Sequence, residues 1–317
     1  MTTRSNRRGP GAARGSAAAT DASAIGPSRL VDPAWLADHL ADPDLRVVHV
    51  SPDRRVYNKH HIPGAILSEL HKELALRGTS PETGDAPRES LVPTREQTAA
   101  LLRRWRVGEG DRVVFYDDVG LNRHGCRGYW LLRLYGFPAD RLHVLDGGLE
   151  AWRRAEQPTT TEVPEPDLAD GLRAPATLGD RDDTLVATYD EVLAWSAEST
   201  GRDRPPTRLL DVRTSSEFVG QDLRARRGGW IPGARQRCFE DLLTPDGTFH
   251  TLEGMFAILR AGGVEPAEVR AVYCQSGVRA ALVWFVLHEL AGYTEVRNYA
   301  GSWEVWGNRD NSPVAGP

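Results

Sequence analysis

The same series of segments occurs twice along the chain, and this internal repeat constrains the fold more than any other feature. In each half an apolar, β-prone segment precedes an Ile-Pro-Gly-Ala turn, and a second strand, an apolar helix and a Trp-bearing segment follow. Strands that alternate with helices predict a mostly parallel sheet flanked by helices, so we predict an α/β fold with two tandem domains in these 317 residues. The matching segments are 45–50 and 208–213, 61–65 and 230–234, 115–117 and 272–274, 134–137 and 290–293, and 146–152 and 300–306.

Local composition sets the expected domain boundaries. Residues 1–27 are rich in Arg, Ala, Gly and Ser and lack a long apolar core, which predicts a disordered tail and excludes a secretory signal; an organelle transit peptide is the alternative. The first domain is expected at 28–158 and the second at 184–317. Between them, 159–183 is rich in Pro, Thr, Asp and Glu and is interpreted as a linker. A surface loop is expected at 77–93.

A cysteine in the second half is the strongest candidate for chemistry. The apolar strand at 271–273 ends at Cys274, and Arg279 opens an apolar segment that is long enough for a buried helix. The loop between them directs backbone N–H groups and the positive end of the helix dipole toward the sulfur, which favours the thiolate that a nucleophile requires. Gly277 gives this loop the backbone freedom that it needs. A buried structural thiol is the alternative interpretation of Cys274.

Five motifs together resemble the tandem-domain rhodaneses, a family of sulfurtransferases with an inactive first domain and a catalytic second one. The resemblance covers about residues 29–314. It implies two rhodanese-like α/β domains, with the active site in the second domain facing the first. Asp117, or Asp118 with a slip of one residue, stands where the first domain would carry the nucleophile. The motifs are the segments 61–65, 146–152, 211–213, 274–279 and 301–307.

The resemblance implies a ping-pong transfer of sulfur through Cys274. The thiolate would take a sulfur atom from thiosulfate, with 3-mercaptopyruvate as the second choice, and the persulfide would pass it to cyanide or to a thiol. A persulfide carrier or regulatory module that delivers sulfur to a specific protein partner is the alternative. A cysteine phosphatase is disfavoured, because its loop has one more residue between Cys and Arg than the segment from Cys274 to Arg279.

The loop after Cys274 is expected to bind the anionic donor and the persulfide through its backbone amides. Arg279 closes the loop, and it either contacts the substrate or braces the loop's carbonyl groups. Ser276 resembles the serine of mercaptopyruvate-preferring relatives and is a candidate hydrogen-bond partner of the persulfide or the donor. The expected substrate-binding residues of this loop are Gln275, Ser276, Gly277, Val278 and Arg279.

Two further residues are implied by the resemblance. Arg213 matches the family arginine that contacts the donor anion, and its alternative is an ion pair with Glu217 four residues on. His61 matches a histidine that relatives use at the site, although we favour a role in holding the turn through hydrogen bonds to backbone groups.

Composition narrows the partners and the compartment. The net charge of −5 provides no basic surface for nucleic acid, and no apolar run is long enough to span a membrane. Three cysteines without C-x-x-C spacing indicate neither a disulfide framework nor a zinc site and favour a cytoplasmic setting. We expect no metal or organic cofactor. The expected form is a monomer whose partners are a small-molecule sulfur donor, a thiol or cyanide acceptor and a thioredoxin-like reductant.

Overall fold

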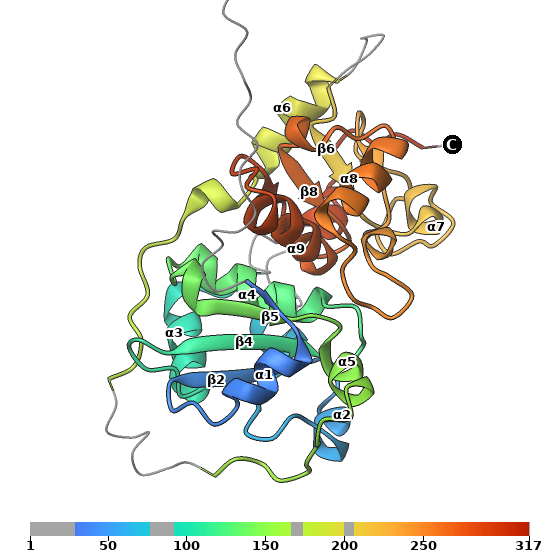
Figure 1. Ribbon diagram of the computed structural model, residues 1–317. Coiled ribbons are helices and arrows are strands. Elements are labelled where there is room, and N and C mark those ends of the chain that lie inside the picture. The colour runs from blue at the N-terminus through green and yellow to red at the C-terminus, as the bar shows by residue number, and fades with distance from the viewer. Residues whose placement is uncertain (1–28, 77–91, 166–173, 200–205, 317) are drawn as a thin grey trace, which may run out of the picture.

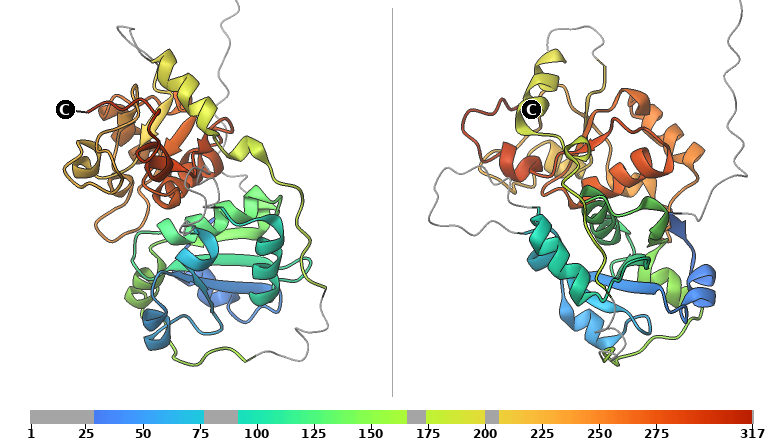
Figure 2. Two further views of the ribbon diagram at one scale, coloured as in Figure 1. Left: turned by 180° about the vertical axis from the view of Figure 1, so that it is seen from behind. Right: turned by 90° about the vertical axis from the view of Figure 1, so that its left-hand side faces the viewer.

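The computed structural model describes residues 29–76, 92–165, 174–199 and 206–316 (Figure 1). The chain forms two α/β halves, and Figure 2 shows from two further sides that the connection between them, in yellow-green, runs along the outside of the first half. The tail predicted at 1–27 and most of the surface loop predicted at 77–93 lie outside the described residues.

The first half is built on a five-stranded parallel sheet in the order β1-β5-β4-β2-β3. Its two central strands pair from Leu45 opposite Arg112 to Val50 opposite Asp117, and their apolar side chains are buried on both faces, as in other parallel sheets. The strands are β1 (Leu30–Val31), β2 (Leu45–Ser51), β3 (Ile66–Glu69), β4 (Arg112–Asp117) and β5 (Leu142–Leu145). The helices are α1 (Pro33–His39), α2 (Arg54–Lys59), α3 (Arg95–Arg104), α4 (Arg123–Leu134) and α5 (Gly148–Arg154).

The second half repeats this topology with a four-stranded parallel sheet in the order β7-β6-β8-β9. These strands take the places of β3, β2, β4 and β5, and a parallel bridge from Val186 to Asn298 takes the place of β1 beside β5. The predicted tandem α/β fold is therefore confirmed. The strands are β6 (Leu209–Asp211), β7 (Arg235–Gln236), β8 (Ala271–Tyr273) and β9 (Arg297–Asn298). The helices are α6 (Tyr189–Glu198), α7 (Ser215–Phe218), α8 (Leu252–Ala261), α9 (Val278–Trp284) and α10 (Ser302–Trp306).

Short helical turns of other kinds complete the two halves. The π-helical segment that follows α9 extends the helix that starts after the Cys274 loop. The π-helical segments are Leu70–Leu74 and Phe285–Leu290, and the 3-10 turns are Ala139–Arg141, Asp183–Leu185, Phe239–Leu242 and Pro266–Glu268.

The two halves pack against each other through α4 and α9, which Figure 1 shows at the facing sides of the halves. Both helices are buried along most of their length because one hydrophobic cluster contains residues of both halves. Within it the ring of Tyr129 meets the edge of Phe285, with ring centroids 4.9 Å apart. The halves therefore share a core and are not joined by the connecting segment alone.

A buried carboxylate strengthens this contact between the halves. Glu289 accepts a hydrogen bond of 2.8 Å from the hydroxyl of Tyr129, and its carboxylate lies 3.2 Å from Arg133 Nε and 3.0 Å from Arg29 Nε. Although burial disfavours the ionised form, the interactions with His288, Arg133 and Tyr129 lower the pKa of Glu289 to about 2. A charge buried between two subdomains is tolerated only when it is paired in this way.

A loop of the second half also reaches over the first half. The backbone N–H of Phe249 donates to Asp146, and Asn122 Nδ2 donates to the carbonyl oxygen of Gly247 at 2.8 Å. Gly247 has φ +79, and a Cβ atom there would lie 1.9 Å from the carbonyl oxygen of Gly120, so only glycine fits this contact. This second attachment lies apart from the α4–α9 contact.

The segment interpreted as a linker packs on the first half where the structure describes it. Thr160 forms an antiparallel bridge with His61, and Pro175 forms one with Gly108. Leu178 is buried in the core. The described parts of the connection, on both sides of residues 166–173, are therefore bound to the first half.

Candidate active site

Cys274 follows the carboxyl end of β8 and is held firmly by the backbone around it. The strand before it, Ala271–Tyr273, is fully buried. The backbone N–H of Cys274 donates to Ser302 Oγ at 3.1 Å, and its carbonyl oxygen accepts from the N–H of Trp303 at 3.0 Å. Cys274 is only 1% exposed, and it lines a cavity between the two halves from which a small ligand can reach its side chain.

The loop after Cys274 has the shape of an anion cradle. Gly277 has φ +75, and a Cβ atom there would lie 2.9 Å from the backbone of Ala300, so the loop requires glycine at this position. The carbonyl oxygen of Gly277 is turned away and accepts hydrogen bonds from Asn298 Nδ2 at 3.1 Å and from Arg127 Nη1 at 3.3 Å. Within the described chain, no acceptor bonds the backbone N–H groups of residues 275–279. These donors are available to an anion at the sulfur.

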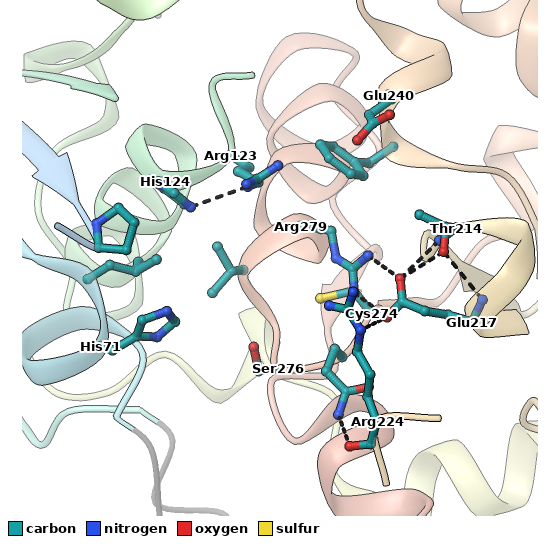
Figure 3. A pocket seen from close by; sticks show the side chains of 15 residues that line it. His71, Arg123, His124, Thr214, Glu217, Arg224, Glu240, Cys274, Ser276 and Arg279 are labelled. Carbon is teal, nitrogen blue, oxygen red and sulfur yellow. Dashed lines mark hydrogen bonds and ion pairs between the residues drawn. The ribbon is translucent and has the colours of Figure 1, made fainter. Parts of the chain in front are cut away.

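The cavity has a volume of about 420 Å³ and receives residues from both halves (Figure 3). Three of the predicted loop side chains, Gln275, Ser276 and Val278, line it, as does Arg279. Gln275 Nε2 donates to Glu304 and to the carbonyl oxygen of Arg224, which ties the loop to the neighbouring wall. The first half contributes Pro52, Leu70, His71, Arg123 and His124.

Arg279 is positioned by a carboxylate that sequence reasoning did not assign to the site. Its Nη1 and Nη2 atoms donate to the two oxygens of Glu217 at 2.5 and 2.8 Å. Glu217 is buried, which opposes its ionisation, but the hydrogen bonds and charge of Arg279 lower the pKa of Glu217 to about 2. Glu217 also caps α7 through Thr214. The guanidinium of Arg279 is thus a fixed charge in the cavity wall and does not brace loop carbonyl groups.

Arg213 is not part of the cavity, in contrast to the expectation that it contacts the donor. Its guanidinium donates to Asp211 Oδ2 at 2.6 Å and to the carbonyl oxygen of Gly229 at 2.8 Å, and it lies 4.5 Å from the ring centroid of Trp303. Nor does it form the alternative hydrogen-bonded pair with Glu217. The reason is local, because Asp211 at the end of β6 is two residues away and binds both Nε and Nη2. Arg213 is thus buried and bound by Asp211 and by the backbone of Gly229.

His61 also lies outside the cavity. Its Nδ1 is 2.7 Å from the carbonyl oxygen of Tyr57, its Nε2 is 3.0 Å from that of Glu162, and its ring stacks on Tyr57. These contacts match the favoured interpretation of a histidine that holds backbone groups around the turn.

The first half has a position that is structurally equivalent to Cys274. Tyr116 and Tyr273 accept equivalent hydrogen bonds, from the backbone N–H groups of Ile62 and Ile231. Asp117, and not Asp118, therefore corresponds to Cys274. Its carboxylate accepts a hydrogen bond from the backbone N–H of His124, and burial raises the pKa of Asp117 to about 6.

The described residues contain neither a cluster of metal-binding side chains nor a helix that could span a membrane. No group of three or more His, Cys, Asp or Glu side chains is placed to hold a metal ion in the described ranges. Among the helices of those ranges, none is long and apolar enough to cross a membrane.

Comparisons with known proteins agree with this geometry. A family model described as "Rhodanese-like domain" matches residues 32–155 and 193–309. A thiosulfate sulfurtransferase from Corynebacterium glutamicum is 36% identical, over 91% of this chain and 90% of its own length. The sulfur carrier protein TtuD from Thermus thermophilus is 32% identical, over 91% of this chain and 97% of its own. The crystal structure of SseA from Escherichia coli, a 3-mercaptopyruvate sulfotransferase, is similar with a TM-score of 0.70 and 26% identity, over 87% and 99% of the two chains.

Proposed function

This chain belongs to the rhodanese family of sulfurtransferases, and from that premise we propose that it moves a sulfane sulfur from thiosulfate through a persulfide on Cys274 to a thiophilic acceptor. The observation that carries the proposal is the setting of Cys274. The sulfur lines the cavity at the start of a loop whose backbone donors are unused, and the guanidinium of Arg279 lies in the same cavity. A nucleophile that must accept and hold a negatively charged sulfur needs this surrounding.

The reaction has two displacement steps at sulfur. The Cys274 thiolate attacks the outer sulfur of thiosulfate, the S–S bond of the donor breaks, and its electron pair leaves with sulfite. In the second step the acceptor attacks the outer sulfur of the persulfide, and the electron pair of that bond returns to Cys274. The loop's N–H groups and Arg279 stabilise the anionic sulfur between the steps, and Ser276 is a further hydrogen-bond partner in the cavity wall.

Thiosulfate is the preferred donor in this proposal because relatives that are at least 30% identical over 90% of the chain or more carry that name. 3-Mercaptopyruvate is the second choice, on the likeness to SseA. The test compares initial rates with each donor, using cyanide as acceptor, for the wild type and for Cys274→Ser. We expect turnover of thiosulfate that the serine variant loses. A serine variant that retains the rate would contradict the role of Cys274.

A persulfide carrier is the second candidate function, favoured by the likeness to the sulfur carrier protein from Thermus thermophilus. A carrier loads one sulfur atom and waits for a partner protein or a thioredoxin-like reductant, whereas an enzyme turns over small molecules repeatedly. Intact mass measurement after incubation with thiosulfate separates the two. One added sulfur on Cys274 without turnover of cyanide would favour the carrier, and no added sulfur would contradict both functions.

A further inference from the structure

Three guanidinium groups line the cavity, and they differ in their partners. Arg279 is bound to both oxygens of Glu217, and Arg224 lies 2.8 Å from Asp222 and 3.7 Å from Glu217. Arg123, at the start of α4 in the first half, has no carboxylate within 4.0 Å in the part of the chain that the structure describes. Among the described residues, Arg123 is therefore the cavity arginine that is not part of a close ion pair, although Glu240 also lines this cavity and Asp117 interacts with its charge at longer range.

Arg123 is nevertheless held in a defined position. Its Nε lies 3.2 Å from His124 Nε2, and its guanidinium lies 5.7 Å from the ring centroid of Phe239, across the boundary between the halves. Burial, together with the charge of Arg123, lowers the pKa of His124 to about 3, so the imidazole stays neutral and its Nε2 can accept the hydrogen bond. In the described ranges, the two terminal nitrogens of Arg123 have no hydrogen-bond partner. The group is oriented before any ligand arrives.

The position of Arg123 suits a ligand larger than an inorganic donor. Figure 3 shows Arg123 and His71 on the first-half side of the cavity, and Cys274 with Arg279 on the other. The loop amides and Arg279 already serve the anion next to the sulfur. A cavity of about 420 Å³ lies in the usual range for organic ligands, and apolar side chains such as Leu70 and Val278 line part of it.

We propose that Arg123 binds the carboxylate of an organic thiol that accepts sulfur from the Cys274 persulfide. This inference rests on the proposed sulfur transfer and adds the chemical class of the acceptor. The acceptor's thiolate attacks the outer sulfur of the persulfide, the S–S bond breaks, its electron pair returns to Cys274, and the acceptor leaves as a hydropersulfide anion. The carboxylate is unchanged, and its hydrogen bonds to Arg123 orient the thiolate toward the sulfur.

The test measures the second step alone. Cys274 is loaded with thiosulfate, the excess donor is removed, and the persulfide is discharged by 3-mercaptopropionate or by 3-mercapto-1-propanol, which has the same chain length but no charge. Rates are expressed per thiolate and compared as a ratio. For the wild type we expect the carboxylated thiol to be faster by roughly tenfold, the low end for a charged hydrogen bond that water partly screens. Arg123→Gln should remove this preference, and Arg123→Lys should keep part of it.

Two controls keep the outcome decisive. Arg226→Gln removes an arginine that pairs with Asp310 outside the cavity, and it should leave the ratio unchanged. Every variant should load one sulfur atom fully when the incubation with thiosulfate is long enough, which shows that each is folded, and Arg226→Gln should also load at the wild-type rate. An unchanged ratio in Arg123→Gln would overturn the inference, and so would slower loading with an unchanged ratio, because Arg123 would then serve the donor. Failure of the wild type to load at all would instead remove the proposed function, and this inference with it.

Discussion

Replacing Glu217 by Gln tests whether a buried ion pair holds Arg279 in the cavity wall. The change keeps the shape of the side chain and, because Gln also serves at the third position of a capping box, keeps the hydrogen bonds with Thr214 that start α7. It removes the charge that both terminal nitrogens of Arg279 contact. The variant therefore isolates the ion pair from the helix cap.

The size of the effect follows from the pKa of Glu217. This pKa is about 2, below the ordinary value of 4.5, because the hydrogen bonds and charge of Arg279 outweigh the cost of burial. At about 1.4 kcal/mol per pKa unit, the difference corresponds to about 3 kcal/mol of folding free energy. Breaking a buried pair by removing one partner costs a similar amount in other proteins, about 3–5 kcal/mol. We therefore expect Glu217→Gln to lower the free energy of unfolding by about 3 kcal/mol at pH 7.

The pH dependence gives the sharper test. A carboxyl whose pKa is depressed on folding stabilises the protein above its unfolded pKa, and this contribution is lost as the pH falls toward the folded value. The difference between wild type and variant should thus be constant above about pH 5 and fall to about 1.5 kcal/mol at pH 3. Urea unfolding followed by tryptophan fluorescence measures it. Glu150→Gln, which breaks an exposed pair with Arg153, is the control and should change little. A difference below about 1 kcal/mol at pH 7, or one that does not depend on pH, would refute the reasoning.

Three further variants test other parts of the structure. Gly277→Ala places an alanine in a left-handed backbone conformation, with its Cβ atom 2.9 Å from the backbone of Ala300. We expect the free energy of unfolding, measured with urea, to fall by at least about 2 kcal/mol and persulfide loading, measured by mass spectrometry, to be slower. Normal values for both would contradict the loop geometry. Burial raises the pKa of Asp117 to about 6, so the protonated carboxyl stabilises the fold and this contribution is lost as the pH rises through 6. In Asp117→Asn the melting temperature should therefore fall less between pH 5 and pH 8 than in the wild type. An equal fall would show that the carboxyl does not titrate in this range. Arg213→Lys breaks a buried two-bond contact with Asp211 and should lower the melting temperature without a selective change in KM for thiosulfate, whereas a raised KM at normal stability would return Arg213 to the donor site.

The parts of the site that sequence could predict are those encoded by neighbours along the chain. An apolar strand that stops at a cysteine and a glycine before an apolar helix are local signals, and the structure has β8, Cys274 and α9 in that arrangement. The repeat predicted two mostly parallel α/β sheets, and the structure shows that the strands of the second follow the same order as their counterparts in the first.

The partners of the charged side chains could not be predicted in the same way. Glu217 was the expected alternative partner of Arg213, and only the fold shows that Asp211 binds Arg213 and that Glu217 binds Arg279, 62 positions away. Only a weak signal in the sequence indicated that Arg123 lies at the site. Arg123 is the first residue of α4, as Val278 is of α9, and the preceding residues, Asn122 and Gly277, both have a left-handed conformation. His71 had none, because it reaches the cavity only through the docking of the two halves.

The loop of the second half that reaches over the first has a consequence for the timing of turnover. The contact between Asn122 and Gly247 joins the two halves in addition to the shared helices and the carboxylate of Glu289, so a large movement of one half against the other would break several of these contacts. We expect the two halves to keep a fixed arrangement during turnover, without domain closure. Donor and acceptor would then exchange by diffusion through a preformed cavity. Solvent viscosity should then influence the turnover rate through the diffusion of donor and acceptor into the cavity, and not through a slow opening of the protein.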